Sequence, residues 1–144
     1  MNCKSIACVF LALASFALAT PTPTPTPTTF PLRASDNGRY LVDAADRPFF
    51  FHADTPWMLI QKLTLAEAEE YMTDRKARGF TSLQIMMTGF LGMRTREGHL
   101  PFDGDHDLTR PNEACFAHAD RVIQKAADLG LFLMIAPMWS GCCN

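Results

Sequence analysis

The chain has 144 residues, of which 48% are hydrophobic and 19% are charged, as in ordinary globular proteins of at most one domain. Its formal net charge of -2 supplies no basic surface for nucleic acid or anionic lipid, and no long run of like charges occurs. The composition therefore argues against a polyanion partner and leaves a neutral or weakly charged small molecule or sugar open.

The first 19 residues have the order of a secretory signal peptide. Lys4 supplies the positive charge, residues 6–18 supply the apolar segment, and Ala17-Leu18-Ala19 is an A-x-A cleavage site. The apolar segment is shorter than the roughly 20 residues that a membrane-spanning helix needs. We therefore expect residues 1–19 to be removed and the mature protein, from Thr20, to be secreted to the extracellular space without a membrane anchor.

Residues 20–31 form a Thr/Pro-rich linker. Proline at every second position fixes φ and removes amide donors, which favours a stiff, extended spacer. Such tracts on secreted chains also carry O-linked sugars, and the pattern leaves a bare and a glycosylated linker open. The mature chain then keeps Cys115, Cys142 and Cys143, an odd number without metal-binding spacing, so we predict neither a zinc site nor a disulfide framework.

The domain that follows, residues 32–144, opens with a predicted β-hairpin. Residues 32–35 and 39–42 flank an Asn37-Gly38 step, which supplies the positive φ that tight hairpin turns need. After a second turn, an apolar run that starts at Phe49 and is flanked by Pro48 and Pro56 predicts a strand that is buried on both faces and ends at Asp54. The polar residues that follow this run lie where α/β folds bind ligands.

Two helix and strand pairs are predicted next. Thr64 and Glu67 form a capping box at the start of a helix that ends at Gly79, and residues 81–87 form a second strand. Residues 88–110 make a connection of a length that is usually functional or disordered.

The second helix begins at Pro111 and Asn112 and ends at Gly130, and residues 131–137 form a third apolar strand. This order of elements is the opening of a right-handed parallel α/β structure.

Ordered motifs along the domain carry a family resemblance. They are LRASDNGRYL at residues 32–41, FHADTPW at 51–57, RGFTSLQ at 78–84, TRPNE at 109–113 and GLFLMIAPMW at 130–139. Together they resemble the N-terminal part of the catalytic domain of the apiosidase-like glycoside hydrolases. The resemblance implies a (β/α)8 TIM barrel, often followed by a small β domain. It also implies hydrolysis of branched plant cell-wall polysaccharides such as rhamnogalacturonan II, a pectin, by a retaining mechanism.

The implied acid/base and nucleophile carboxylates belong to later barrel strands, so no catalytic residue is assigned in this chain. We expect an α/β fold that is the N-terminal portion of the barrel, a β-hairpin plus about three βα units, and incomplete, because closing a barrel takes about 250 residues. The chain is then an inactive N-terminal fragment of a secreted glycoside hydrolase that needs no cofactor. The alternative is a truncated, non-catalytic secreted binding or interaction protein.

Asp54, Trp57, Gln84 and Trp139 are the predicted contacts to the carbohydrate substrate. A carboxylate and an amide suit sugar hydroxyls, and an indole offers an apolar face to a sugar ring. Structural alternatives stay open: Asp54 caps a turn, Trp57 belongs to the core, Gln84 is a buried amide, and Trp139 packs beneath a further strand.

The remaining histidines and carboxylates are expected to have structural roles. His52 lies within an apolar strand and is expected to be a core histidine with its polar atoms satisfied. His99, His106 and the aspartates at 103, 105 and 107 crowd the long connection but lack a metal-binding spacing, so we predict a solvated loop and no metal.

Overall fold

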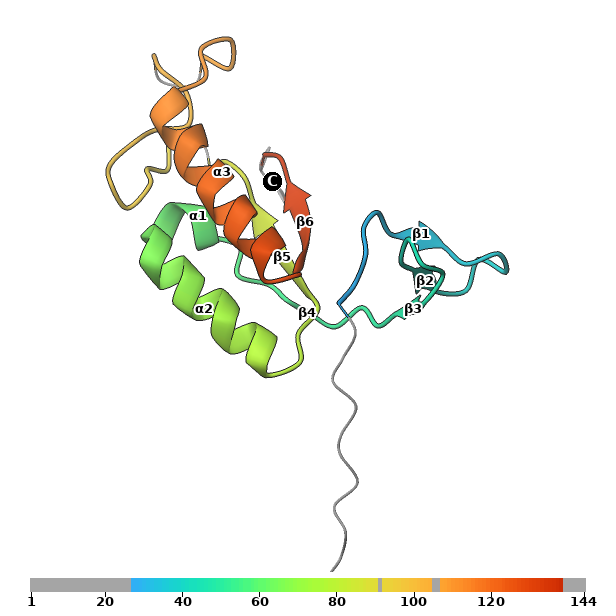
Figure 1. Cartoon of the computed structure of the whole chain (residues 1–144). Helices are drawn as coiled ribbons and strands as arrows, with labels where there is room; N and C mark the ends of the chain where they lie inside the picture. Colours follow the sequence, from blue (N-terminus) through green and yellow to red (C-terminus); the bar gives the residue numbers. More distant parts are fainter. Residues whose placement is uncertain (1–26, 91, 105–106, 139–144) are drawn as a thin grey trace, which may run out of the picture.

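The computed structural model describes residues 27–90, 92–104 and 107–138 (Figure 1). The predicted signal peptide, most of the linker, Trp139, Cys142 and Cys143 lie outside these residues. The described chain forms two three-stranded sheets. Helices pack on only one of them.

The first sheet is antiparallel and has the order β1-β2-β3. It contains β1 (Arg33–Ala34), β2 (Leu41–Val42) and β3 (Pro48–Phe49). The predicted hairpin between β1 and β2 is confirmed, and Gly38 in its turn has a φ of 68°. Glycine enters this left-handed region without the steric cost that a Cβ adds.

Asp43 fixes the turn between β2 and β3. Its buried carboxylate accepts hydrogen bonds from Arg47 Nε at 2.9 Å, Ala45 N at 2.9 Å and Thr29 N at 3.2 Å. The hydrogen bond from Arg47 is the main reason that the pKa of Asp43 lies well below its usual range. One carboxylate thus joins the segment before β1 to the second turn.

This second turn makes the prediction of one buried strand from Phe49 to Asp54 wrong in its first half. Because the chain folds back at Asp43, Pro48 and Phe49 pair antiparallel with β2 and do not enter the parallel sheet. Phe49 is buried, but Phe50 and Phe51 are 75% and 41% exposed. The apolar run is therefore divided between a strand end and an exposed crossing segment.

The second sheet is parallel and has the order β4-β5-β6. It contains β4 (Ala53–Asp54), β5 (Ser82–Met86) and β6 (Phe132–Ala136), with α1 (Leu59–Lys62) and α2 (Leu65–Ala77) between β4 and β5, and α3 (Glu113–Asp128) between β5 and β6. The βαβαβ order expected from the sequence is confirmed, whereas the short helix α1 was not predicted.

Both long helices begin at side-chain caps. Thr64 and Glu67 form the predicted capping box of α2, with both of its hydrogen bonds present. Asn112 caps α3 by accepting hydrogen bonds from Ala114 N at 3.1 Å and Cys115 N at 3.3 Å. These caps satisfy backbone amides that the helices leave without an internal partner.

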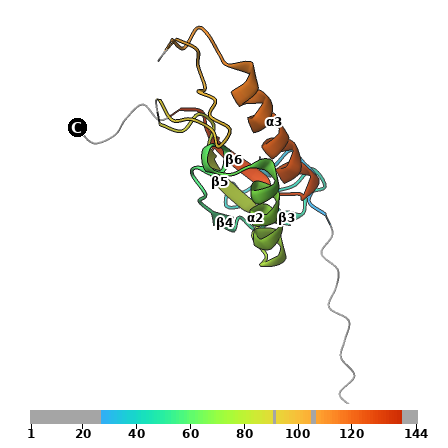
Figure 2. The ribbon, with the colours of Figure 1, turned by 90° about the vertical axis from the view of Figure 1, so that its left-hand side faces the viewer.

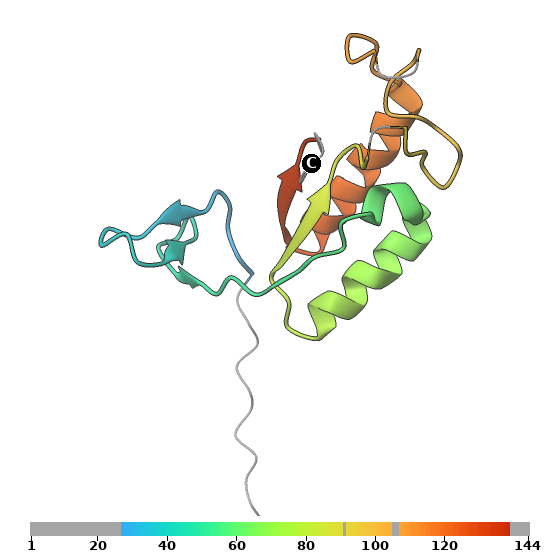
Figure 3. The same ribbon diagram turned by 180° about the vertical axis from the view of Figure 1, so that it is seen from behind.

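Strand alternation places the core on one side of the parallel sheet. Leu83 and Ile85 of β5 are fully buried against the helices, together with Met72, Val122 and Leu131. Figures 1, 2 and 3 show all of the helices on this same side of β4, β5 and β6.

We call the opposite side of the sheet, formed by the even-numbered residues of β5 and β6, the open face. Ser82 and Met86 at the ends of β5 are buried there, Gln84 between them is half-buried, and Met134 of β6 is 37% exposed. Within the described ranges the strands close no barrel, and no helix is long and apolar enough to cross a membrane.

Phe132 joins the two sheets. Its ring lies 6.2 Å from the rings of Phe30 and Phe49 and 6.3 Å from that of Phe51. Because Phe132 is the first residue of β6, this aromatic cluster packs the antiparallel sheet beside the amino-terminal end of the parallel strands. Their carboxyl-terminal ends remain on the far side.

Candidate functional site

The carboxyl-terminal ends of β5 and β6 lie together and, with the segment that follows β4, form what we call the carboxyl edge. Met86 N at the end of β5 donates to Trp57 O at 3.0 Å, which places Trp57 beside that end. Thr88 Oγ1, which is buried, donates to Pro137 O at 3.2 Å and joins the ends of β5 and β6. Ligands of α/β proteins bind at this edge.

Gln84 lies on the open face, midway along β5. Its neighbours Leu83 and Ile85 face the helices, so the Gln84 side chain is on the opposite side of β5. In the parallel register Gln84 is paired with Met134. Its side-chain amide makes no hydrogen bond to any residue that the structure describes, which leaves a donor and an acceptor for a ligand.

Asp54 lies on the helix side of the sheet. It is the last residue of β4, as expected, but it is in register with Leu83 near the amino-terminal end of β5 and so lies away from the carboxyl ends of β5 and β6. Its Oδ2 accepts a hydrogen bond from Tyr71 at 2.6 Å and forms an ion pair with Arg75 Nε at 2.7 Å. This geometry supports a structural role, and a contact between Asp54 and a sugar stays a prediction.

Tyr71 and Arg75 hold Asp54 in its charged form. The hydrogen bond from Tyr71 is the largest of several effects that lower the pKa of Asp54, and the charge of Arg75 adds to it. The Arg75 guanidinium also lies 4.6 Å from the centre of the Tyr71 ring and 5.8 Å from that of Phe80. One face of α2 is thereby fixed to the first parallel strand.

Trp57 is half-buried at the carboxyl edge, immediately before α1. Together with Pro56, Leu59 and Leu63 it borders a shallow, mainly apolar depression. An indole in this position can pack against a neighbouring element or against a sugar ring. Trp139, the other predicted stacking residue, lies outside the described residues.

Gln61 and Gly89 shape the carboxyl edge and were not predicted. Gln61 of α1 is 2% exposed, and its Nε2 donates to Met87 O at 2.8 Å, just beyond β5. Gly89 has a φ of 68°, and a Cβ there would lie 3.0 Å from both Gln61 Cγ and Met93 Sδ. Sequence patterns gave no signal for this contact because α1 is too short to show a helical period.

His52 differs from its expected place in the core. The residue is exposed, and its ring stacks on Phe80 with 4.2 Å between ring centres. Its Nδ1 lies 3.3 Å from Gly79 O. The prediction was wrong because β4 begins after His52, so the residue belongs to the exposed segment that crosses between the sheets.

The long connection is held by its own polar contacts. Asn112 Nδ2 donates to Asp103 at 2.9 Å, and Thr109 Oγ1 donates to Asp107 at 2.6 Å. The Thr109 hydrogen bond lowers the pKa of Asp107. Among the described residues no group of histidines, cysteines and carboxylates is arranged to hold a metal ion. Asp105 and His106 lie outside these residues.

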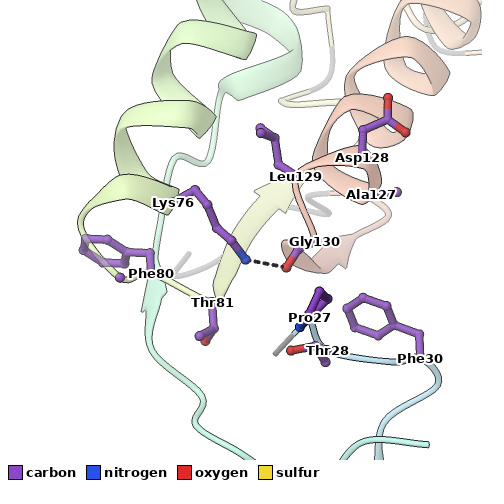
Figure 4. A pocket seen from close by; sticks show the side chains of 11 residues that line it. Pro27, Thr28, Phe30, Lys76, Phe80, Thr81, Ala127, Asp128, Leu129 and Gly130 are labelled. Carbon is purple, nitrogen blue, oxygen red and sulfur yellow. Dashed lines mark hydrogen bonds between the residues drawn. The ribbon is translucent and has the colours of Figure 1, made fainter. Parts of the chain in front are cut away.

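A larger pocket lies at the opposite end of the strands from the carboxyl edge. Its volume is about 580 Å³, and residues 27–30 form one wall against the C-terminal ends of α2 and α3 (Figure 4). Lys76 Nζ crosses it and donates to Gly130 O at 3.0 Å (Figure 4). Because functional residues of barrel-like α/β folds gather at the carboxyl ends, we assign this pocket to packing of the N-terminal segment.

The sequence and the fold agree with one family. The sequence profile described as "Apiosidase-like, catalytic domain" matches residues 35–144. The chain belongs to the apiosidase-like family. Comparison with curated proteins gave no match.

Two solved structures that match this apiosidase-like chain are described as glycoside hydrolases. One described as "Glycoside hydrolase" matches with a TM-score of 0.68 and 28% identity, over 75% of this chain and 25% of that chain. A glycoside hydrolase family 5 protein from Bacteroides vulgatus matches with a TM-score of 0.66 and 25% identity, over 75% of this chain and 24% of that chain. The apiosidase-like chain thus spans about a quarter of the length of these hydrolases, and relative to them it is a partial domain.

We expect Asp54→Asn to destabilise the apiosidase-like domain in a pH-dependent way. A lowered folded-state pKa contributes stability above the unfolded value of about 3.9, and this contribution is lost as the pH falls through the folded-state value. Urea unfolding should therefore give a deficit of roughly 1 to 2 kcal/mol at neutral pH that shrinks below about pH 4. Asp120→Asn, at an exposed position of α3, is the control, and an equal deficit at every pH would contradict this role.

We expect Gly89→Ala to cost more stability than Gly92→Ala. Both glycines have positive φ, at 68° and 80°, so both substitutions carry the left-handed backbone cost of about 1 kcal/mol. Only the Cβ at position 89 meets Gln61 and Met93, which adds about 1 kcal/mol or more of overpacking. Chemical denaturation measures the difference, and equal losses would mean that the Gln61 contact does not constrain this turn.

Proposed function

We propose that the chain is the N-terminal part of a secreted, retaining glycoside hydrolase with a (β/α)8 barrel that acts on branched plant cell-wall polysaccharide. Membership of the apiosidase-like family and the partial overlap with solved glycoside hydrolases support this proposal. Its substrate is a carbohydrate, as in glycoside hydrolases generally. The plant polysaccharide and its pectic linkage are the specific part of the proposal.

The observation that carries the proposal is the one-sided parallel sheet. In a closed barrel, helices cover the outside of the strands and the inner residues face one another across the axis. The order β4-β5-β6, with helices on one side only and Gln84 and Met134 on the other, is what the first strands of such a barrel require. Further βα units would cover the open face and complete the ring.

The same observation leads us to propose that the chain is inactive alone. Retaining hydrolysis needs two carboxyl groups about 5 to 5.5 Å apart, one to protonate the leaving oxygen and one to attack the sugar. The open-face residues of β5 and β6 include no carboxylate, and Asp54 is paired with Tyr71 and Arg75 on the helix side. In this proposal, both catalytic carboxylates belong to βα units that follow residue 144.

Within the completed site, Gln84, Trp57 and Trp139 are the proposed sugar contacts. Gln84 has an amide available on the open face, and Trp57 lies at the carboxyl edge. Trp139 follows β6 closely in the sequence, and its role as a stacking platform is inferred from that position. For Asp54 to contact a sugar, its carboxylate would have to leave Tyr71 and Arg75 of α2.

Export is part of the proposal. Residues 1–19 would direct secretion, residues 20–31 would separate the domain from the processed end, and residues 32–144 would be the hydrolase portion. The order of charge, apolar segment and small residues in the leader supports this division.

We expect the purified chain to release no sugar from rhamnogalacturonan II or from apiose or arabinose glycosides. Without an acid and a nucleophile on either side of the glycosidic bond, the barrier to hydrolysis is not lowered. Reducing-sugar and chromatographic assays measure the release, with a pectinase mixture as the positive control for the substrates. Hydrolysis by the chain that is abolished by Asp54→Ala would contradict the proposal.

An inactive chain is expected both for a hydrolase fragment and for a non-catalytic protein. The coding DNA downstream distinguishes the two. We expect the reading frame, directly or across an intron, to continue into three or more further βα units. A transcript that ends after residue 144 in every preparation would instead support the truncated binding or interaction protein.

A further inference from the structure

A small polar pocket with an aromatic wall lies on the antiparallel sheet. Its volume is about 260 Å³. It is lined by Arg33, Ser35, Asp36, Asn37, Tyr40, Val42 and Asp46. Since Phe132 packs this sheet beside the amino-terminal end of the parallel strands, the pocket is separate from the carboxyl edge. Figure 1 shows β1, β2 and β3 apart from the carboxyl-terminal ends of β5 and β6.

The hairpin holds the Tyr40 ring at the surface. Ser35 N donates to Tyr40 O at 2.8 Å, and Tyr40 N donates to Ser35 Oγ at 3.2 Å, so the backbone of Tyr40 is fixed on both sides. The side chain is nevertheless 49% exposed, a large aromatic area left facing water. A tyrosine has only two side-chain torsions, so a half-exposed ring on a fixed backbone can stack on the apolar face of a sugar at little cost in conformational entropy.

Charged groups around the ring supply donors and acceptors. Arg33 is paired with both Asp36 and Asp46, which brings the two carboxylates to one side of the pocket. Each carboxylate has about four acceptor directions, and the pair with Arg33 occupies only part of them. The side chains of Asp36 and Asp46 are 100% and 73% exposed, so their remaining oxygens can accept hydrogen bonds from hydroxyl groups.

We propose that this pocket binds a neutral sugar residue of the polysaccharide, as a second carbohydrate site away from the carboxyl edge. The class of ligand rests on the proposed function. One guanidinium against two carboxylates leaves the pocket with a net charge of -1, which disfavours a uronate and favours an uncharged sugar. The site would hold one part of a branched polymer while another part lies at the carboxyl edge.

Affinity electrophoresis of the whole chain in gels that contain neutral arabinan or polygalacturonate tests the proposal. We expect arabinan to retard the chain and polygalacturonate to retard it much less. Tyr40→Ala should abolish the retardation, whereas Tyr40→Phe, which keeps the ring, should preserve it. Circular dichroism of both variants should match that of the unchanged chain, because position 40 is exposed.

The outcomes that overturn the proposal are equally specific. No retardation by arabinan, stronger retardation by polygalacturonate, or equal retardation of Tyr40→Ala would each exclude a neutral-sugar site at Tyr40. Gln84→Ala distinguishes this site from the proposed hydrolase site. If retardation is lost in Gln84→Ala and kept in Tyr40→Ala, the sugar binds on the open face. That result would contradict the second site and leave the proposed function standing. Retardation that depends on Tyr40 supports the second site even if the assay of hydrolysis fails.

Discussion

The parallel register of β4, β5 and β6 is the constraint on which the rest of the structure depends. Because side chains alternate along a strand, Leu83 and Ile85 enter the core beneath the helices, and Gln84 between them must face the other way. The same register puts Asp54 opposite Leu83, on the helix side, where it accepts a hydrogen bond from Tyr71 and pairs with Arg75 of α2. A shift of one residue would exchange these faces, burying the amide among apolar side chains and exposing the core.

Two buried or partly buried carboxylates and one aromatic cluster attach the rest of the chain to this sheet. Asp54 fixes α2, Asp43 fixes the turn that ends the antiparallel sheet, and Phe132 packs the two sheets together. All three lie away from the carboxyl edge, which leaves that edge to Trp57, Gln61 and the turn at Gly89. This separation of stabilising residues from the proposed substrate edge is what barrel-like α/β proteins need, since loops at the carboxyl ends carry their chemistry.

Sequence patterns predicted the elements with local signals and missed those set by distant contacts. The capping box at Thr64, the cap at Asn112 and the Asn37-Gly38 turn each require only neighbouring residues, and all three were found where expected. The apolar run at residues 49–51 gave a wrong prediction because the turn at Asp43 decides which strand it pairs with. The sequence pattern of the run itself does not show that turn. His52 was misplaced for the same reason, because the parallel strand starts only at Ala53. Asp54 does end that strand as predicted, but β4 is so short that this end lies beside the amino-terminal part of β5. Gln84 was located correctly in the second predicted strand, because a polar residue inside an otherwise apolar run is easy to recognise in the sequence.

Oxidation of methionines by dilute hydrogen peroxide, followed by mass spectrometry of peptides, tests the one-sided sheet most directly. Met134 on the open face is 37% exposed, and Met72 of α2 in the core is fully buried, so the two residues are internal controls for each other. The structure predicts that Met134 is oxidised much faster than Met72 in the folded chain, and that the two rates become similar in urea. Equal protection of Met134 and Met72 in the folded chain would contradict it, because the face that carries Gln84 would then be covered.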